Sequence, residues 1–456
     1  MSLWGGRFAD GPDDVLWSYT ASTSDRRLLE VDIEGSIAHA AMLGTTGIIQ
    51  DEEAKALNTG LLEVLSEARS GTFEFHDADE DVHSAVERRL IELTGEVGRM
   101  LHTGRSRNDQ IALDLRLYLL RAADQRMEQL AGFVATLAEL AGGQAETVVP
   151  SYTHLQQAQA IPLGHHLLAY AWMALRDRQR FADLKVRLSV SPLGAGAAGG
   201  SSLPLDPEAV ASALDLDGVF SNSMDAVAAR DLIAEYAWVC AQSMVHASRL
   251  AEELILWTSQ EFGWVTFADR LTTGSSALPQ KKNPDIAELA RGKAAGTIGD
   301  LTALLALQKG LPLAYNRDLQ EDKEHVFRAD DTLAATLEAL TAMLSTAEFH
   351  APPPSPWVTA LDLAEALVER GVPFRTAHQA VGKLVAGLLA RGKDLSEAAV
   401  EDLAAADPAF RADDLERVDP IDSVRRRVTP GGGSRESVRQ QIEQLQTILA
   451  SITGQF

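Results

Sequence analysis

Cysteine is almost absent from this sequence, which contains a single residue of this type, Cys240. One cysteine excludes an internal disulfide framework. Cys240 lies in the apolar run EYAWVCAQSMV. This context favours a small buried hydrophobic side chain over a reactive thiol.

Long apolar runs are also absent, since none approaches the roughly 18 residues that a membrane-spanning helix needs. The N-terminal stretch MSLWGGRFADGPDD has no basic segment followed by an apolar core, so no signal peptide is visible. We therefore expect a cytoplasmic protein.

Basic residues are scarce relative to acidic ones, with 41 against 65, which gives a formal net charge of −24. Such a charge repels nucleic acids and anionic membrane surfaces, so neither is an expected partner. It does not exclude an anionic small-molecule substrate, because a local group of lysines and arginines can reverse the field within a cleft.

Strand patterns are scarce too, and are expected only in short pieces near Phe73–Phe75. Helical periodicity dominates instead, as in the run from Asp109 to Gly143, where Leu113, Leu117 and Leu120 follow four- and three-residue steps. Further helices are expected from Pro162 through LGHHLLAYAWMALRDRQRFADLKVRL and over residues 225–259. Helices of this length predict an all-α fold with a long-helix bundle that forms an oligomer core.

Two breaks divide the chain. The run APPPSPW at residues 351–357 cannot continue a helix, and another break falls near Gly104, before the first long helix. We expect a small N-terminal helical domain over residues 1–104, a central long-helix domain over 105–356 and a small C-terminal helical domain over 357–456.

Several common functional motifs are missing. The run GAGAAG at residues 194–199 follows a helix rather than a strand and is followed by GSSLPLD, so a dinucleotide site is not supported. No phosphate-binding P-loop and no G-x-S-x-G elbow occur. His165 and His166 are neighbours on a helix and point in different directions, so no dedicated metal site is expected.

The stretch GSSALPQKKNPD at residues 274–285 is suited to bind an anion. Asn283 is a favoured helix N-cap and Pro284 suits a first helical position. The positive end of this helix, together with Lys281 and the adjacent Lys282, can hold a carboxylate or stabilise developing negative charge. A capped helix after a polar loop would produce the same pattern.

Three further segments favour the functional interpretation. LHTGRSRNDQ places Arg105, Arg107, Asn108 and Asp109 at the start of the first long helix, where arginine can bind a carboxylate bidentately. SYTHLQQAQ surrounds His154 with hydrogen-bonding side chains, and histidine transfers protons near neutral pH. The third segment, LAYNRDLQEDKE, gathers polar and charged side chains within one helix-sized stretch: Tyr315, Asn316, Arg317, Gln320 and Lys323.

These segments together resemble the fumarase/aspartase superfamily, whose members eliminate fumarate from a succinyl group. Within it, HTGRSRNDQ, YTHLQQAQ, the Gln-Lys-Lys-Asn-Pro ending of the loop and YNRDLQEDK are similar to the argininosuccinate lyase family. The match extends from WGGRF at Trp4 to TPGG at Thr429. The loop carries Ala277-Leu278 where that family usually has an apolar residue followed by methionine.

The resemblance implies reversible β-elimination of argininosuccinate to L-arginine and fumarate, the last step of arginine biosynthesis, with no cofactor and no metal. It also implies a homotetramer around a central helix bundle, with each active site built by three subunits. Two alternatives remain open: another fumarate-releasing lyase, such as an adenylosuccinate lyase, and an inactive crystallin-like structural protein on the same fold.

Residue roles are carried over from the resemblance by position. Ser275 is the expected general base, His154 assists departure of the guanidinium nitrogen, directly or through water, and Glu288 pairs with this histidine across a subunit boundary. His83 has a supporting role. The expected substrate-binding residues are Ser22, Asp25, Arg107, Asn108, Thr153, Arg230, Lys281, Asn283, Tyr315, Gln320 and Lys323.

Overall fold

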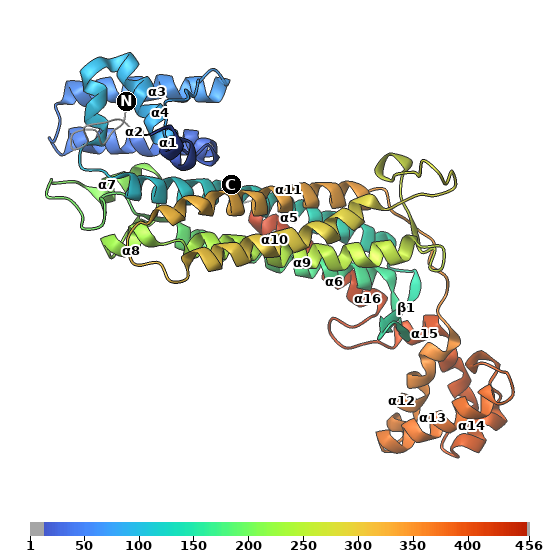
Figure 1. Ribbon diagram of the computed structural model, residues 1–456. Coiled ribbons are helices and arrows are strands. Elements are labelled where there is room, and N and C mark those ends of the chain that lie inside the picture. The colour runs from blue at the N-terminus through green and yellow to red at the C-terminus, as the bar shows by residue number, and fades with distance from the viewer. Residues whose placement is uncertain (1–12, 454–456) are drawn as a thin grey trace. The chain divides into compact units, whose positions relative to one another are not determined.

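The computed structural model describes residues 13–453 and is built almost entirely of helices (Figure 1). The segment WGGRF at Trp4 lies outside the described residues. The all-α fold expected from the sequence is confirmed. The five longest helices are α5 (Arg107–Gly143), α6 (Leu163–Leu188), α9 (Asp231–Thr258), α10 (Asp285–Gln308) and α11 (Asp322–Leu344).

The chain forms two compact units, each made of three stretches of sequence. The first comprises Met1–Glu128, Arg178–Met244 and Lys293–Ala334, and the second comprises Gln129–Asp177, Val245–Gly292 and Ala335–Phe456. These boundaries fall inside the long helices, so each long helix contributes residues to both units. The three-domain division of the sequence stays a prediction.

The N-terminal part of the first unit contains short and medium helices. They are α1 (Asp14–Thr20), α2 (Leu29–Thr45), α3 (Asp51–Ser70) and α4 (Val82–Thr94), with the 3-10 helices η1 (Ser24–Leu28) and η2 (Gly95–His102). Leu43, Leu57 and Leu90 are completely buried between them. Gly60 permits close packing of α3 on α4, because a Cβ atom there would lie 2.6 Å from Leu90 Cδ1. This packing fixes α4 beside α2 and α3.

Buried polar contacts connect the long helices within the first unit. Tyr236 of α9 donates a hydrogen bond to the Asp330 carboxylate of α11 at 2.6 Å, and Arg126 of α5 donates to the Asp330 carbonyl oxygen at 3.3 Å. Tyr118 of α5 packs edge-on against Phe327 of α11 with centroids 4.8 Å apart. Pairing of buried polar groups keeps their desolvation cost small, so these contacts fix the helix register.

The helix expected over residues 225–259 is interrupted, so that expectation was wrong in one respect. The structure has a short helix α8 (Ser223–Ala228), a break over Ala229 and Arg230, and then α9. Arg230 donates to the carbonyl oxygens of Val227 and Ala229, at 3.4 Å and 3.2 Å. The buried guanidinium donates to these two carbonyl groups and so stabilises the break. Such a tertiary arrangement cannot be predicted from the spacing of apolar residues.

The first unit also contains α7 (Pro207–Ala213), η4 (Arg317–Glu321) and a short parallel pair of strands, β3 (Val190–Ser191) and β4 (Gly218–Val219). The carboxylate of Asp109, near the start of α5, accepts hydrogen bonds from the backbone N–H groups of Ser106, Gly194 and Gly196 at 2.8–3.1 Å. The glycine-rich run at residues 194–199 is therefore attached to the beginning of α5.

Two histidines of the first unit, the buried His39 and the half-buried His102, have a lowered pKa. His39 Nε2 donates to the Thr103 carbonyl oxygen at 2.9 Å, whereas its Nδ1 is buried without a partner among the described residues. Burial, followed by the charge of Arg105, lowers the pKa of His39 to about 3. Burial, followed by Arg105 and Arg107, lowers the pKa of His102 to about 4.

These histidines predict acid sensitivity. The unfolded chain binds protons at a pKa near 6.5 and the folded chain does not, so stability is complete above pH 6.5 and falls as pH decreases toward 4. The slope is roughly 1 kcal/mol per pH unit for each histidine. Thermal unfolding from pH 7.5 to 4.5 should show His39→Gln losing less stability than the wild type on acidification; identical profiles would contradict this assignment.

The second unit contains an unexpected hairpin. Strand β1 (Val148–Thr153) pairs antiparallel with β2 (Gln156–Pro162), and the register shifts between Pro150 and Tyr152. A second antiparallel pair joins β5 (Val265–Thr266) to β6 (Glu348–Phe349). The strand expected near Phe73–Phe75 was wrong, because these residues form no strand and their rings pack edge to face instead.

The C-terminal part of the second unit is helical. Its elements are η5 (Pro356–Thr359), α12 (Ala360–Glu369), α13 (Phe374–Leu389), η6 (Leu395–Glu397), α14 (Val400–Ala406), η7 (Ala412–Val418), α15 (Pro420–Arg425) and α16 (Arg435–Thr453). A further 3-10 helix, η3 (Asp269–Leu271), lies between α9 and α10. Leu363, Leu367 and Leu388 form part of one core. Arg370 binds both carboxylate oxygens of Asp414, at 2.6 Å and 2.7 Å.

None of the helices within residues 13–453 is both long enough and apolar enough to cross a membrane.

Candidate active site

A pocket of about 250 Å³ lies within the first unit. It is formed by the segment before η1, the start of α4, the head of α5, η4 and the first turn of α11. The substrate-binding residues expected in this unit line it, with the exception of Arg230. The lining residues are Ser22, Asp25, Glu80, Asp81, His83, Arg107, Asn108, Ile111, Tyr315, Arg317, Gln320 and Lys323.

The head of α5 places two of these residues. Arg107 is the first residue of the helix and forms an ion pair with Asp81, with Glu87 3.9 Å away. Asn108 donates from its side-chain amide to the carbonyl oxygen of Ala197 at 3.1 Å. Arg107 therefore enters the pocket held by a carboxylate, which preorganises its guanidinium for a second anionic partner.

Residues of η4 and α11 form another part of the pocket lining. Gln320 Nε2 donates to the carbonyl oxygen of Thr20 at 3.1 Å, and Arg317 forms an ion pair with Glu80 at 3.3 Å. Lys323 is only 3% exposed, and its Nζ donates to the Gln320 carbonyl oxygen at 3.2 Å and to Asp322 at 3.1 Å.

Both signs of charge face this pocket. Asp25 is buried, accepts from the Val82 N–H at 3.3 Å, and has its pKa raised mainly by burial. Burial also opposes ionisation of Asp81, but the charges of His83 and Arg107 and hydrogen bonds from Ser84 lower the pKa of Asp81 below its usual value. A small cavity with carboxylates and cations suits a zwitterionic ligand such as the α-amino and α-carboxyl groups of an amino acid.

Arg230 does not line the pocket. This residue is 2% exposed and its Nε donates to Asp322 at 2.6 Å. The same carboxylate accepts from Lys323. Asp322 thus bridges Arg230 and Lys323, which gives Arg230 an indirect connection to the pocket.

The serine loop, residues 274–282, lies in the second unit and is closed at its base. Thr273 and Asn283 exchange two backbone hydrogen bonds, at 3.2 Å and 2.8 Å. The Ser275 Oγ accepts hydrogen bonds from the backbone N–H groups of Ala277 at 3.2 Å and Leu278 at 3.1 Å. Two N–H donors aimed at one hydroxyl oxygen would stabilise negative charge on it.

The start of α10 differs from the expectation. The helix begins at Asp285, after Pro284, and the Asn283 side-chain amide donates to the Gly274 carbonyl oxygen at 3.5 Å. Asn283 therefore contacts the serine loop, and among the described residues no capping hydrogen bond joins its side chain to α10. Lys282 forms an ion pair with Asp269, whereas the exposed Lys281 side chain has no such partner among the described residues.

His154 occupies the turn of the β1–β2 hairpin. His154 and Leu155 both have φ of 56°, in the left-handed region that non-glycine residues seldom adopt. Each such residue costs on the order of 1 kcal/mol, and strain of this kind clusters at functional sites. Thr153, the last residue of β1, and His154 are both exposed.

The three catalytic candidates, His154, Ser275 and Glu288, do not form a common site within the described part of one chain. Glu288 is exposed on the first turn of α10. Across residues 13–453, no hydrogen bond or ion pair connects His154, Ser275 and Glu288. The structure thus presents the hairpin turn and the serine loop as separate exposed features of the second unit.

Sequence reasoning missed some pocket residues, notably Glu80, Asp81 and Ile111. Asp81 is the N-cap of α4 and accepts from the Ser84 N–H at 2.7 Å. The Asp-x-x-Ser spacing before an amphipathic run was the available signal, but it predicts a helix start rather than an ion pair with Arg107.

Comparison with known proteins adds an independent finding. A family model described as lyase matches residues 6–299, and one described as argininosuccinate lyase C-terminal matches residues 357–425. The argininosuccinate lyase of Carboxydothermus hydrogenoformans is 45% identical over 456 residues, which cover 99% of this chain and 100% of that protein.

The chain belongs to the argininosuccinate lyase family. The enzyme of that name from Frankia casuarinae is 48% identical over 455 residues, covering 98% of each chain. That from Synechococcus sp. is 48% identical over 448 residues, covering 97% of this chain and 95% of the other. The resemblance given by the serine loop and its companion segments is confirmed, and so is the assignment as a lyase.

Solved structures show the same fold. EDDS lyase, in a variant with bound fumarate, superimposes with a TM-score of 0.81 at 27% identity, covering 95% of this chain and 88% of the other. The 3-carboxy-cis,cis-muconate lactonizing enzyme from Pseudomonas putida gives a TM-score of 0.72 at 21% identity, with coverage of 95% and 99%. At that identity the second likeness speaks for the fold alone.

Proposed function

We propose that this member of the family cleaves argininosuccinate reversibly into L-arginine and fumarate, the last step of arginine biosynthesis. The proposal is supported by two complementary structural features, in a chain that is related to argininosuccinate lyases along its full length. One part is a mixed-charge pocket for an amino-acid group, and the other is a loop that directs backbone N–H groups at a serine hydroxyl.

The chemistry begins at the succinyl carbon. Ser275 removes a proton from the carbon next to a carboxylate. The N–H groups that contact its Oγ stabilise the ionised hydroxyl, which is the form that accepts this proton. Extra negative charge then develops on the substrate carboxylate. Lys281 and Asn283 bind that carboxylate and stabilise the charge, each well-placed donor lowering the barrier by roughly 3 kcal/mol.

The bond between the succinyl group and the guanidinium nitrogen then breaks, on the side of the substrate opposite the removed proton. His154 assists departure of the guanidinium nitrogen by proton transfer, directly or through water, and Glu288 of another subunit orients the imidazole. The strained backbone at His154 supports this role, because two left-handed residues at an exposed turn are costly without a function. No metal or other cofactor takes part in this scheme.

The arginine end of the substrate occupies the pocket of the first unit. Asp25 and Ser22 face its cationic groups, and Arg107 faces a carboxylate. Arg230 acts indirectly by holding Asp322 beside Lys323. The remaining binding residues of the proposal are Asn108, Thr153, Tyr315, Gln320 and Lys323.

The proposal includes a homotetramer in which each active site draws on three subunits. On α10 the exposed residues Ala295, Ile298, Thr302 and Leu305 share one face, and Ile298 and Leu305 are 45% and 55% exposed. Exposed apolar side chains on a long helix mark an interaction surface, which a second copy of the chain would cover.

We also propose a cytoplasmic location and the three domains with boundaries near residues 104 and 356. The boundary near residue 356 is supported by the family match that starts at residue 357.

Mixed oligomers test the shared site. Ser275→Ala and Lys323→Met should each be inactive alone. Because the two residues would come from different subunits, co-expressed chains in equal amounts should regain about a quarter of the wild-type activity through sites with both residues intact. Mixed oligomers that stay inactive would contradict the shared site, and separately purified chains combined without subunit exchange are the control.

A substrate panel tests the activity. Fumarate release from argininosuccinate, adenylosuccinate, aspartate and malate should occur with argininosuccinate alone, accompanied by an equal amount of L-arginine. Activity only on one of the other three compounds would assign a different fumarate-releasing lyase. No activity on any of them, in a protein with intact oligomeric structure, would assign a crystallin-like structural role.

A further inference from the structure

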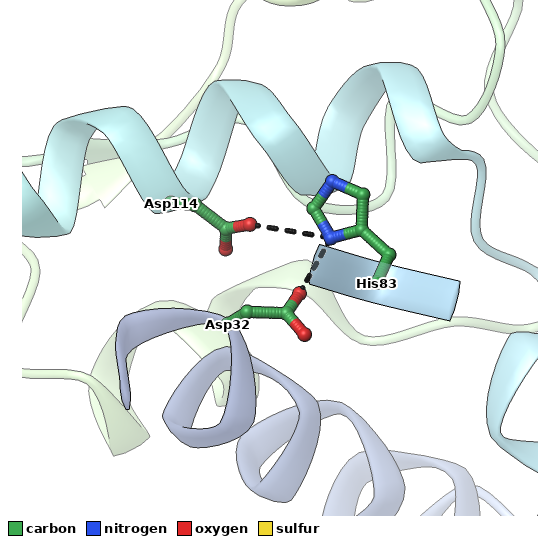
Figure 2. Close-up of side chains that lie close together, drawn as sticks. All are labelled: Asp32, His83 and Asp114. Atoms are coloured by element: carbon green, nitrogen blue, oxygen red, sulfur yellow. Dashed lines mark hydrogen bonds and ion pairs between the residues drawn. The ribbon is translucent and has the colours of Figure 1, made fainter. Parts of the chain in front are cut away.

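Figure 2 shows a buried cluster of titratable side chains in the first unit, which shares His83 with the pocket. It consists of Asp32 from α2, His83 from α4 and Asp114 from α5, which are 1%, 5% and 1% exposed. His83 Nδ1 lies 2.8 Å from Asp32 Oδ1 and 3.6 Å from Asp114 Oδ2. Three helices therefore converge on one imidazole ring.

His83 belongs to both the cluster and the pocket. Its Nδ1 is directed at the two aspartates, and Figure 2 shows the other ring nitrogen on the far edge of the ring. His83 also lines the pocket, and no hydrogen bond of its Nε2 is found within residues 13–453. Nε2 is consequently the ring nitrogen left for a ligand.

The two aspartates have different environments. Asp32 Oδ1 accepts two hydrogen bonds, from His83 Nδ1 and from Gln110 Nε2 at 2.5 Å, as an ionised carboxylate would. Neither oxygen of Asp114 has a hydrogen-bond partner in the described part of the chain. Burial, followed by the charge of Asp32, raises the pKa of Asp114 well above its usual value. Burial opposes ionisation of Asp32 as well, but His83, Arg105 and Gln110 together lower its pKa.

Charge balance also indicates that Asp114 is protonated and that Asp32 is ionised. The ligand atoms of Asp32, His83 and Asp114 all lie within 4.8 Å of one another, and two carboxylates at that distance in a buried site cannot both remain ionised at low cost. Asp114 Oδ1 and Oδ2 and Asp32 Oδ2 are the unpartnered carboxyl oxygens of the cluster, so a proton on Asp114 would give one of them a donor. The charge of Arg105, a half-buried residue, also favours the ionised form of Asp32 and lowers its pKa.

We propose that Asp32 and Asp114 are positioning residues for the lyase reaction, which they serve through His83. Asp114 stays protonated and donates a hydrogen bond to Asp32. Asp32 is ionised and also accepts the Nδ1–H of His83, and the imidazole is thereby fixed with Nε2 facing the substrate in the pocket. The same three side chains have the spacing of a cation site, but the Nδ1–Oδ1 hydrogen bond and the nearby Arg105 favour a proton network. This inference rests on the proposed function for its kinetic consequence.

Asymmetry between the two aspartates is the expected kinetic signature. An asparagine at position 114 keeps a donor toward Asp32, so Asp114→Asn should retain kcat/KM within about threefold of the wild type. Asp114→Ala removes that donor and should lose about tenfold. Asp32→Asn removes the anionic acceptor of Nδ1–H and should lose on the order of 100-fold in kcat/KM.

A double-mutant cycle separates positioning from a structural role. If Asp32 acts through His83, the double variant Asp32→Asn/His83→Gln should be no slower than His83→Gln alone. Additive losses in the cycle would overturn the proposal, as would equal losses in Asp114→Asn and Asp114→Ala. Each oligomer is compared at equal concentration of folded protein, so that reduced stability is not mistaken for reduced activity.

A spectroscopic readout keeps the proposal testable if argininosuccinate is not the substrate. Nitrogen-15 NMR of the full-length oligomer labelled at histidine, with His83→Gln identifying the signals, should show a protonated Nδ1 of His83 that changes in Asp32→Asn but not in Asp114→Asn. An unprotonated Nδ1 in the wild type would overturn the proposal. Wild-type protein that leaves argininosuccinate uncleaved but shows these signals would contradict the proposed function alone.

Discussion

Replacing Ser275 with alanine is expected to leave the oligomer folded and able to bind argininosuccinate, while kcat falls by at least about 1,000-fold. Within residues 13–453 the Ser275 Oγ has two hydrogen bonds, from Ala277 and Leu278, and the loop base is held separately by Thr273 and Asn283. The loss should therefore appear in turnover, measured as fumarate release, and not in the apparent affinity for substrate.

Ser276 provides the matched control for this experiment. It lies next to Ser275 on the same loop, is exposed, and shares the chemistry of a serine hydroxyl. Ser276→Ala should keep kcat within about threefold of the wild type, since surface substitutions away from the reacting atoms have small effects. A Ser275→Ala protein that retains substantial turnover would remove this residue from the role of base.

Breaking the buried pair of Arg230 and Asp322 is expected to have the largest effect on stability. Arg230→Met would leave the Asp322 carboxylate buried with Lys323 as its remaining cation, at 3.1 Å. Removal of one member of a buried ion pair typically costs about 3–5 kcal/mol, because the other charge stays desolvated. The free energy of unfolding in urea, measured on the full chain, should fall by that amount.

An exposed ion pair gives the comparison. Arg69 contacts Glu30 and Glu34 at 3.1 Å and 3.0 Å, but its side chain is 57% exposed. Arg69→Met should cost no more than about 1 kcal/mol, because solvent screens such a pair. If Arg230→Met and Arg69→Met lower the free energy of unfolding equally, the buried pair does not hold the α8–α9 break and α11 together as inferred.

The long helices could be predicted because their stabilising pattern is local. Apolar residues at three- and four-residue steps define α5 and α6 within a few residues of the observed ends at Gly143 and Leu188. The same rule was wrong across Ala229, where the helix is interrupted by hydrogen bonds from Arg230 that depend on tertiary contacts. The periodicity of apolar residues does not indicate which carbonyl groups accept hydrogen bonds from a buried guanidinium.

The hairpin was missed for a related reason. Its turn consists of His154 and Leu155, neither of which is a usual residue for the left-handed conformation that a two-residue turn requires. A sequence pattern looks for glycine or asparagine at such a turn. The departure from local preference coincides with the histidine proposed to act in catalysis, and such conflicts are typical of functional positions.

Motif resemblance identified most of the pocket, but not its internal contacts. Arg107, Asn108 and Lys323 were expected to bind substrate, and the structure places them around one cavity. The ion pair between Arg107 and Asp81 and the two N–H groups on the Ser275 Oγ depend on side-chain geometry. Neither follows from the order of residues along the chain.

The central claim is that the serine loop of one subunit and the pocket of another act on the same substrate molecule. A crystal structure of the Ser275→Ala oligomer with argininosuccinate tests it most directly. We predict a succinyl carboxylate bound by Lys281 and Asn283, with the arginine end of that molecule between Asp25 and Arg107 of a different subunit. Argininosuccinate bound in the pocket, with the serine loop of every subunit beyond contact with it, would contradict the claim.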